Sequence, residues 1–254
     1  MRVLVWYSDG AASAVAAHFA VQKYGERCEV VKCDTTGDEH PDNLRFRRDV
    51  EAWIGRTVTL IRSEKYAGID DVFDRTGYMA GIHGARCTTE LKKKVRRDFE
   101  RPDDIHVFGY TADESHRVSK FEAHNPELRC DWILRDRQIT KDDCYYLLDR
   151  AGIALPEMYR LGYEHNNCLG CVKATSAAYW ARVRLHFPDV FARRVVQSRS
   201  LGVRLIRLPG HGDERFYVDE IPDDFPVDGP DGDIECGPFC EMQPSLFAGE
   251  SEAA

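Results

Sequence analysis

Residues 2–24 read RVLVWYSDGAASAVAAHFAVQKY, and this stretch decides the fold class. Residues 2–7 are apolar and rich in strand-forming side chains, whereas residues 8–13 are small or polar. Helix-forming residues with apolar side chains at helical spacing return over residues 14–24. A strand, a tight loop and a helix in this order are typical of the opening of a doubly wound α/β domain.

The alternation of strand and helix patterns continues along the first half of the chain. After the opening unit we expect strands over residues 28–34, 57–62 and 105–110, with a helix over residues 40–54. This spacing predicts an α/β fold: a doubly wound, mostly parallel sheet with helices on both faces.

The pattern changes after about residue 135. Helices are expected over residues 140–151, 174–186 and 188–200, while the sequence from residue 209 onward is rich in Gly, Pro and Asp and shows little periodicity. We therefore predict three regions: an α/β domain over residues 1–135, a helical, cysteine-containing extension packed on it over residues 136–208, and an irregular tail over residues 209–254.

The composition is that of an ordinary globular protein. The chain has 254 residues, of which 43% are hydrophobic and 31% charged. No apolar run approaches the ~20 residues that span a bilayer, so no membrane partner is expected. The short apolar N-terminus lacks the features of a signal peptide. We therefore expect a cytoplasmic protein.

The formal net charge is −8, which argues against a general nucleic-acid coat protein because such binding depends on Lys and Arg neutralising phosphates. One concentrated positive run is nevertheless present, at Lys92, Lys93, Lys94, Arg96 and Arg97. It is compatible with a solvated helix face or with a phosphate site. A nucleic-acid partner therefore stays open but is not favoured.

The loop over residues 8–13 has the composition of a phosphate-binding loop. Its members are Ser8, Asp9, Gly10, Ala11, Ala12 and Ser13. Small residues let backbone N–H groups approach phosphate oxygens, and the helix that follows presents its positive end to an anion. The two hydroxyls can add hydrogen bonds. A plain tight turn is the competing interpretation.

Polar residues also follow two other predicted strands, where open α/β sheets place their ligands. Asp34, Thr35 and Thr36 follow the second strand and could bind a ribose or adenine edge, or cap a helix. Gly109 closes the fourth strand, and Glu114 and Arg117 follow it. These two charged residues could contact a phosphate or ribose, or pair with their neighbours.

Four segments together resemble the PAPS reductase-like branch of the ATP-pyrophosphatase (PP-loop) superfamily of adenine nucleotide alpha hydrolases. The resemblance spans residues 2 to about 200 in the same order. The segments are Ser8–Ser13, similar to the SGGxxS loop; Arg86–Lys92, similar to a C-T-x-x-L-K element; Gly109–Arg117, similar to a G-x-R-x-x-E-S-x-x-R element; and Asn166–Lys173, similar to NNCxGCxK.

This resemblance implies an adenine nucleotide as partner and substrate, with its pyrophosphate or phosphate held by the first loop. Lys92 would contact the phosphate or the acceptor. Asp9 stands where the family has the first glycine of its pair, and Thr111 where it often has arginine. For this reason ATP, PAPS and adenylyl sulfate cannot be ranked as the nucleotide.

Nine cysteines in a reducing compartment favour metal binding or catalysis over a disulfide framework. Cys168 and Cys171 have the spacing of a chelating pair, and Cys87 would be a third ligand if its loop lies near them. We expect a 4Fe–4S cluster. Zinc, with a fourth ligand from Cys236, Cys240, His165 or His83, is the alternative, and a redox dithiol is another. Cys28, Cys33, Cys130 and Cys144 are expected in the core.

The segment Glu235-Cys236-Gly237 resembles the C-terminal Glu-Cys-Gly of sulfonucleotide reductases, in which the cysteine attacks the sulfate sulfur. The resemblance thus implies catalysis by Cys236, which requires an accessible thiolate. The histidine that follows in the family is absent, and Cys240 lies four residues on. The pair could instead clamp a metal or act as a resolving dithiol.

The leading hypothesis is an enzyme that binds an adenine nucleotide and handles sulfur, either as a PAPS or adenylyl sulfate reductase or as an ATP-dependent sulfurtransferase. A thioredoxin-like protein or another electron or sulfur donor is the expected partner, and a homodimer is compatible with the sequence. The alternatives are a nucleic-acid-modifying sulfurtransferase component and a non-catalytic, zinc-stabilised nucleotide-binding protein.

Overall fold

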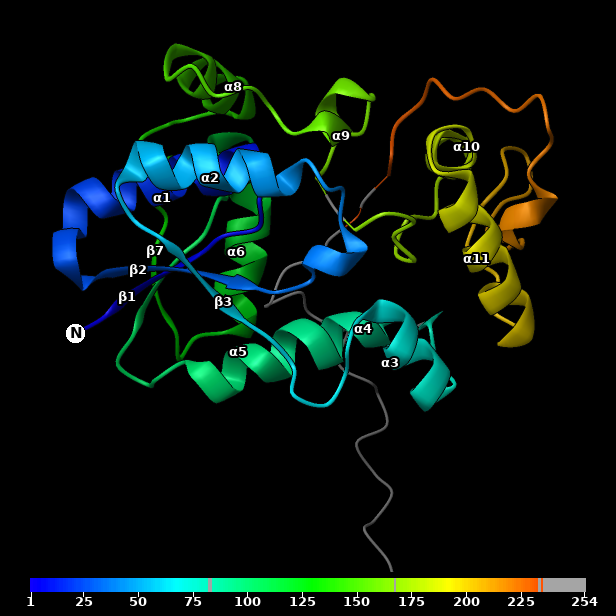
Figure 1. Cartoon of the computed structure of the whole chain (residues 1–254), viewed down its shortest axis with the longest axis horizontal. Helices are drawn as coiled ribbons and strands as arrows, with labels where there is room; N and C mark the ends of the chain where they lie inside the picture. Colours follow the sequence, from blue (N-terminus) through cyan, green and yellow to red (C-terminus); the bar gives the residue numbers. More distant parts are fainter. Residues whose placement is uncertain (82–83, 167, 233, 235–254) are drawn as a thin grey trace, which may run out of the picture.

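The computed structural model describes residues 1–81, 84–166, 168–232 and 234. Its centre is a five-stranded sheet in which every pair of neighbouring strands is parallel. The strands stand in the order β3 (Val58–Ile61), β2 (Cys28–Cys33), β1 (Val3–Trp6), β6 (Ile105–Val107) and β7 (Arg129–Asp131). The predicted doubly wound α/β fold is therefore confirmed (Figure 1).

Helices cover both faces of this sheet, because alternate residues of a strand point to opposite sides. On one face, Val3 and Val5 pack with α1 (Ala11–Tyr24), α2 (Asn43–Ile54), α7 (Ile133–Asp136) and α8 (Lys141–Arg150). On the other face, Leu4 and Trp6 pack with α6 (Ser115–His124) and the end of α5 (Lys94–Phe99). The fully buried central strand β1 thus carries both cores.

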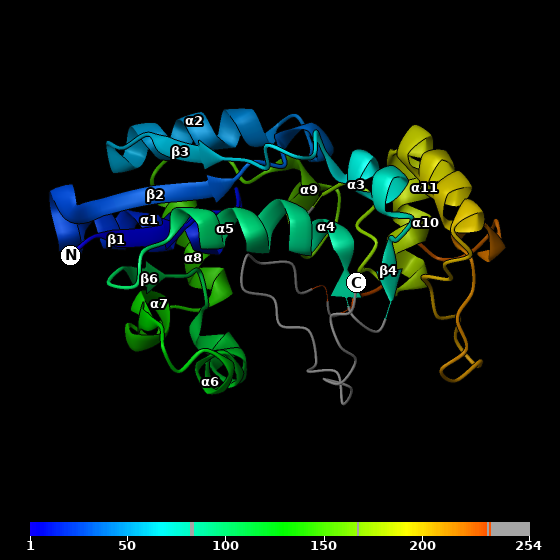
Figure 2. The ribbon, with the colours of Figure 1, turned by 90° about the horizontal axis from the view of Figure 1, so that it is seen from below.

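A third core lies beside the sheet. It joins α3 (Ile69–Thr76) and α4 (Arg86–Thr88) to α9 (Glu157–Arg160), α10 (Ala177–His186) and α11 (Pro188–Ser200). The antiparallel pair β4 (Ala80–Gly81) and β5 (Gly84–Ala85) lies at the same end of the molecule (Figure 2). Residues from both sides of the predicted boundary at residue 135 therefore share this core, and the three-region division stays a prediction.

Two helices begin three residues later than the sequence predicts. Helix α2 begins at Asn43 rather than His40, because Pro41 disfavours the helical conformation at the residue before it. Helix α10 begins at Ala177 rather than Ala174, because the Ser176 hydroxyl accepts a hydrogen bond from the Tyr179 N–H at 3.4 Å and so caps the helix.

Among the described residues, none of the helices combines the length and apolar character needed to cross a membrane.

A buried histidine on β6 makes the stability of the sheet sensitive to acid. His106 Nδ1 accepts a hydrogen bond from the Trp6 indole N–H at 3.0 Å, and burial lowers the pKa of His106 to about 4. As the pH falls below about 6.5 the unfolded chain binds a proton at this imidazole, whereas the folded chain resists until about pH 4. The stability due to the neutral imidazole is therefore lost across this interval.

We expect His106 to account for a loss of about 2 kcal/mol in the free energy of unfolding between pH 7 and pH 5. Urea unfolding at both pH values measures the loss. In a His106→Phe variant, which has no group titrating at this position, the loss should be smaller by that amount. Equal losses in the variant and the wild type would contradict the assignment.

Candidate functional site

A pocket lies at the carboxyl ends of β1 and β6. From β1 the chain proceeds to β2 and β3 on one side of the sheet, and β6 and β7 lie on the other side. The strand order therefore reverses between β1 and β6. Open α/β sheets bind ligands at this switch point. The pocket has a volume of about 430 Å³, and its walls include the loops after both strands together with Tyr159, His165, Asn166 and Cys168.

The loop after β1 presents its backbone to this pocket. Gly10 is extended and is followed at once by the first turn of α1; as the N-cap residue it makes no side-chain cap, and the first turn carries no acidic residue. The Ser13 hydroxyl accepts a hydrogen bond from the Ser8 N–H at 3.2 Å and donates one to the Gly10 carbonyl at 2.9 Å. The positive end of α1 is therefore open to an anion.

Tyr159 supports the loop from the other side. Its hydroxyl accepts a hydrogen bond from the Ala11 N–H at 3.4 Å, and burial raises the pKa of Tyr159 to about 12. The side chain is consequently a neutral group at physiological pH. It can support the helix N-terminus without repelling an anion.

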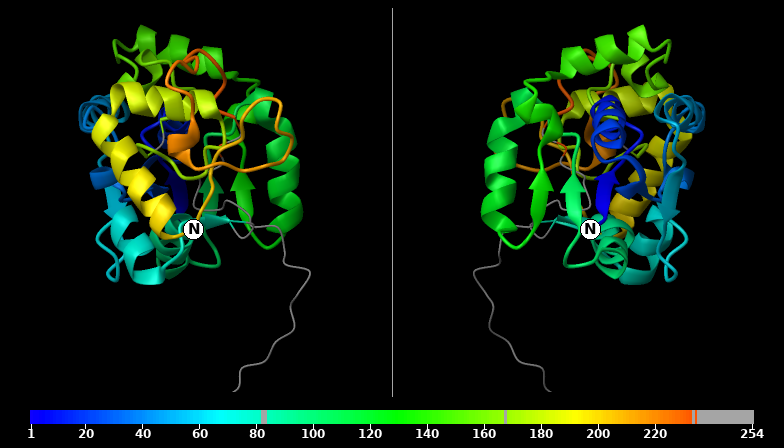
Figure 3. Two further views of the ribbon diagram at one scale, coloured as in Figure 1. Left: turned by 90° about the vertical axis from the view of Figure 1, so that its right-hand side faces the viewer. Right: turned by 90° about the vertical axis from the view of Figure 1, so that its left-hand side faces the viewer.

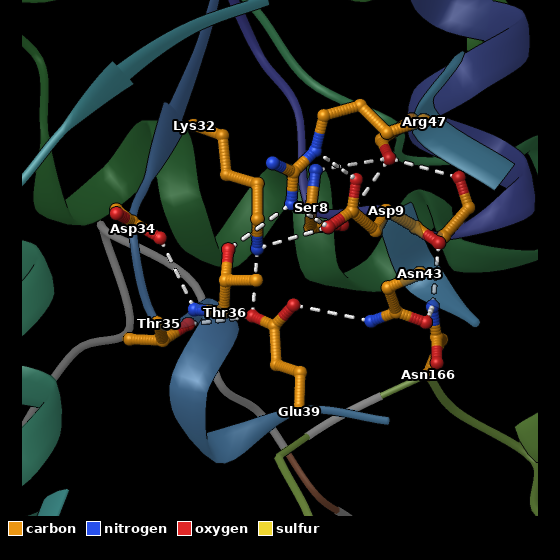
Figure 4. A network of polar contacts seen from close by, with 12 residues as sticks. Ser8, Asp9, Lys32, Asp34, Thr35, Thr36, Glu39, Asn43, Arg47 and Asn166 are labelled. Atoms are coloured by element: carbon orange, nitrogen blue, oxygen red, sulfur yellow. Dashed lines mark hydrogen bonds and ion pairs between the residues drawn. The ribbon is translucent and has the colours of Figure 1, made fainter. Parts of the chain in front are cut away.

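Asp9 belongs to this loop, where its backbone has φ = 56° and the residue has no exposed surface. Its carboxylate accepts two hydrogen bonds from Arg47, at 3.0 and 2.6 Å, and lies 3.2 Å from the Lys32 ammonium (Figure 4). Asp9 is not among the residues that line the pocket. Its negative charge is therefore neutralised inside the protein and does not face a bound anion.

The Asp9 cluster extends to Glu39 and to two buried asparagines (Figure 4). Lys32 donates to Glu39 at 2.6 Å, and although burial alone would raise the pKa of Glu39, the ammonium keeps it below its usual range. Asn43 donates to Glu39 at 3.1 Å, and Asn166 donates to the Asp9 carbonyl at 2.6 Å. The loop is thus tied to β2, to α2 and to the segment that leads into Cys168.

Gly109, at the end of β6, lies against the loop after β1. A Cβ added at Gly109 would be 2.7 Å from the Ser13 nitrogen and 2.9 Å from the Ala12 carbonyl carbon, both backbone atoms. Only glycine fits at such distances. The close packing of these two loops explains why the sequence has glycine at this strand end.

The turn after β6 carries the acidic and basic residues predicted for the site. Glu114 accepts from the Thr111 N–H at 3.2 Å and forms an ion pair with Arg117. The Arg117 guanidinium also lies 4.9 Å from the Tyr110 ring centroid. Glu114 and Arg117 therefore pair with their neighbours while lining the pocket.

The structure brings most of the predicted nucleotide-site residues to one pocket, together with Lys92. Those that line it are Ser8, Gly10, Ala11, Ala12, Ser13, Lys92, Gly109, Glu114 and Arg117. Asp34, Thr35 and Thr36 instead line a separate cleft of about 560 Å³ at the ends of β2 and β3. In that region Asp34 accepts from the Thr36 N–H at 3.1 Å, and the Thr35 hydroxyl donates to Glu39 at 2.6 Å.

The pocket also contains residues that the sequence did not single out for the nucleotide. These are Lys32, Glu39, Asp113, Lys120, Lys141, Tyr159, His165 and Asn166, among others. Burial and then the nearby Lys141 lower the pKa of His165. Asp113 and Asn166 belong to two of the motif segments, whereas Lys32, Glu39, Lys120, Lys141 and Tyr159 lie outside them, so no spacing in the sequence marked those five.

The basic run at residues 92–97 divides between different environments. Lys92 lines the pocket, whereas Lys94 pairs with Glu90 at 2.8 Å and Arg96 lies 3.6 Å from Glu100. Only part of the run therefore faces the site. Lys94 and Arg96 instead form ion pairs along the helix itself.

Cys87, Cys168 and Cys171 line one small cavity of about 20 Å³. Cys87 therefore lies near the pair, which is the condition under which it could be a third ligand. Lys92 and Cys168 line both this thiol cavity and the larger pocket. The wall between the two spaces is thus formed in part by a thiol and an amine.

Three thiols are a suitable donor set for zinc or for an iron–sulfur cluster. A cavity of about 20 Å³ holds little more than one water molecule, which is much less than a four-iron cluster requires. Within the described residues, no three His, Cys, Asp or Glu side chains are arranged to hold a metal ion. The donor chemistry fits, but a cluster would require these side chains to move apart.

The segment between the two cysteines is held by its backbone. The Leu169 N–H donates to the Asp38 carbonyl at 2.8 Å, and the Cys171 N–H donates to the Tyr179 hydroxyl at 2.8 Å. Gly170 adopts φ = 61° between them. Cys168 and Cys171 therefore project from a fixed turn.

Several predicted residues have no structural account here. Cys236, Cys240 and His83 lie outside the described residues, as do residues 235–254 of the predicted tail.

Of the cysteines expected in the core, Cys28 and Cys144 are buried, which raises the pKa of their thiols to about 11 and about 12. Cys33 is buried as well and also lines the pocket, whereas Cys130 is half-buried.

No protein-family model matches the chain, and no curated protein matches its sequence.

Proposed function

We propose that this chain is an adenine-nucleotide-dependent enzyme that handles sulfur, similar to the PAPS reductase-like branch of the PP-loop superfamily. One observation carries the proposal. The pocket at the switch point of the sheet and the cavity lined by Cys87, Cys168 and Cys171 share Lys92 and Cys168. A ligand that fills this pocket would therefore lie against side chains that also line the thiol cavity.

The charge of the pocket supports a phosphate-bearing ligand. Its lining includes five lysines and arginines, namely Lys32, Lys92, Arg117, Lys120 and Lys141. They outnumber the three carboxylates of Glu39, Asp113 and Glu114, in a chain whose net charge is −8. A cationic cleft in an acidic protein concentrates anions locally. This contrast favours a nucleotide over an uncharged substrate.

In this proposal the loop residues bind and orient the nucleotide. The N–H groups at the start of α1 and the hydroxyls of Ser8 and Ser13 hold a phosphate or sulfate group. Lys92 stabilises the negative charge that builds up during transfer, as preorganised donors do. Neutral Tyr159 and the buried pairing of Asp9 keep competing negative charge away from the ligand.

Two reactions fit this arrangement. In a reductase, the Cys236 thiolate attacks the sulfonate sulfur, the S–O bond to the phosphate breaks, and the nucleotide leaves with the bonding electrons; a dithiol donor of the thioredoxin type then releases sulfite. In a sulfurtransferase, an acceptor oxygen displaces pyrophosphate from ATP, and a sulfur nucleophile then displaces AMP. Cys236 follows two positions after Ile234, which lines the pocket.

Cys87, Cys168 and Cys171 are the residues that would hold a metal centre. An iron–sulfur cluster there would supply a site for sulfide, whereas zinc would serve as a structural tie. Anaerobic purification followed by metal analysis and a visible spectrum separates these two cases.

Replacing Cys168 provides the direct test of the proposal. We expect wild-type protein to bind ATP, PAPS or adenylyl sulfate in titration calorimetry, and Cys168→Ser to retain this binding within a few-fold. Turnover of the nucleotide should fall roughly a hundredfold or more, because the thiol beside the pocket is lost. Cys144→Ser, which removes a buried thiol that does not itself line the pocket, is the matched control and should turn over normally.

Two outcomes would count against the proposal. If no adenylyl compound binds the wild-type protein, the nucleotide site is wrong. If Cys168→Ser turns over as fast as Cys144→Ser, the shared wall has no chemical role. Cys236→Ser then separates the two reactions, since it should abolish sulfite release in a reductase but leave formation of AMP and pyrophosphate intact in a sulfurtransferase.

A further inference from the structure

The C-terminal strap, defined here as residues 221–232 and 234, runs along α10 and ends at the nucleotide pocket (Figures 1 and 3). Its last described residue, Ile234, is only 5% exposed and forms part of the pocket wall. The strap therefore connects the helical end of the molecule to the mouth of the site. The contacts that attach the strap to α10 therefore determine the position of Ile234 in the pocket wall.

Arg182 of α10 is the main attachment point. It is 5% exposed and donates to the Val227 carbonyl at 2.7 Å and to the Gly229 carbonyl at 2.9 Å. Its other terminal nitrogen pairs with the Asp231 carboxylate. One buried guanidinium thus binds three positions of the strap over five residues.

Asp231 connects the same anchor to a second segment of the pocket wall. Its carboxylate has no exposed surface and accepts a second hydrogen bond, from the Glu164 N–H at 2.7 Å. Glu164 immediately precedes His165 and Asn166, which both line the pocket. The Arg182–Asp231 pair therefore fixes two parts of the wall together.

The strap has little freedom to shift along α10 between these points. The Ser176 hydroxyl donates to the Pro230 carbonyl at 2.7 Å. A Cβ added at Gly229 would lie 2.9 Å from the Ala178 Cβ, so the strap approaches the helix as closely as glycine allows. The register of the strap on the helix is thus set by contacts at Ser176 and Ala178 as well as at Arg182.

We propose that Arg182 and Asp231 are positioning residues of the nucleotide pocket, which hold Ile234 and the His165–Asn166 segment at the distance that a bound nucleotide requires. This inference rests on the proposed nucleotide site. Neither residue lines the pocket. Their effect on binding is therefore transmitted through the strap.

Arg184, two residues along the same helix, offers a matched control. It donates to the carbonyls of Ile221, Pro222 and Asp223 at 3.1, 2.8 and 3.1 Å. Arg184 thus binds three backbone oxygens of the strap, whereas Arg182 binds two. Its contacts lie at the end of the strap that is farther in sequence from Ile234. Loss of Arg184 tests for general loosening of the strap.

The test is the nucleotide affinity of Arg182→Gln, Arg182→Lys and Arg184→Gln, measured by titration calorimetry with the nucleotide that the wild type binds best. We expect Arg182→Gln to raise the Kd at least tenfold, Arg182→Lys to recover part of that loss because it keeps a charge beside Asp231, and Arg184→Gln to stay within twofold. Equal Kd values for the two glutamine variants would overturn the inference.

Ile234→Ala covers the case in which Arg182→Gln does not fold. This substitution leaves the anchor intact and removes only the side chain that the anchor places at the pocket. We expect it to raise the Kd about fivefold or more; an unchanged Kd would overturn the inference. If the wild type itself binds no adenylyl compound, the proposed function fails, which is a separate outcome from a failure of the anchor.

Discussion

Replacing Asp9 with glycine is expected to lower the free energy of unfolding by about 3–5 kcal/mol. Glycine suits the backbone at this position, where φ is 56°, and it is the residue that the family resemblance would place there. The change nevertheless removes the carboxylate that Arg47 and Lys32 share and leaves two buried cations without it. Loss of charge compensation outweighs relief of the backbone, which is worth only about 1 kcal/mol.

Urea unfolding at pH 7 measures this change. Gln138→Gly is the matched control, since Gln138 has nearly the same backbone angle (φ = 57°) but an exposed side chain. That control should change stability by about 1 kcal/mol or less. If Asp9→Gly is as stable as the wild type, the buried pairing of Asp9 with Arg47 and Lys32 does not stabilise the loop.

Gly109→Ala should have the largest effect on nucleotide binding of any single methyl group. The added carbon would lie 2.7 Å from the Ser13 nitrogen, and the Ser13 backbone belongs to the loop itself. The loop must move away, so the N–H groups that face the anion lose their alignment. We expect the Kd for the nucleotide to rise about a hundredfold and the free energy of unfolding to fall by about 1–3 kcal/mol.

Gly37→Ala is the control for this substitution. Gly37 has no atom within 4 Å of an added Cβ and lies at the neighbouring end of β2. We expect its nucleotide affinity to match the wild type in titration calorimetry. Comparable losses in Gly37→Ala and Gly109→Ala would show that binding is not governed by the contact between the two loops.

Four of the five strands of the sheet were predicted because their sequence signals are local, whereas the short strand β7 was missed. Residues 3–6 are apolar without interruption, which is typical of a strand buried on both faces, and the helix of residues 11–24 follows directly. Loops at the ends of such strands gather at one edge of a parallel sheet. The contribution of Ser8, Ser13 and Gly109 to one pocket follows from this geometry.

The pairing of Asp9 with two buried cations was not predictable from local sequence signals. Its partners Lys32 and Arg47 lie 23 and 38 residues away, and neither a strand lysine nor a helix arginine indicates by its neighbours that it faces inward. Asp34, by contrast, has the expected strand-end position but lines the second cleft. Which strand-end residues meet depends on loop packing, which spacing alone does not encode.

The burial of Asp9 with Lys32 and Arg47 couples these three positions. Replacing any one of them leaves a buried charge without a partner, and buried Glu39 still requires Lys32 even when position 9 is glycine. The effects of substitutions at the three positions on the free energy of unfolding are therefore expected to be non-additive.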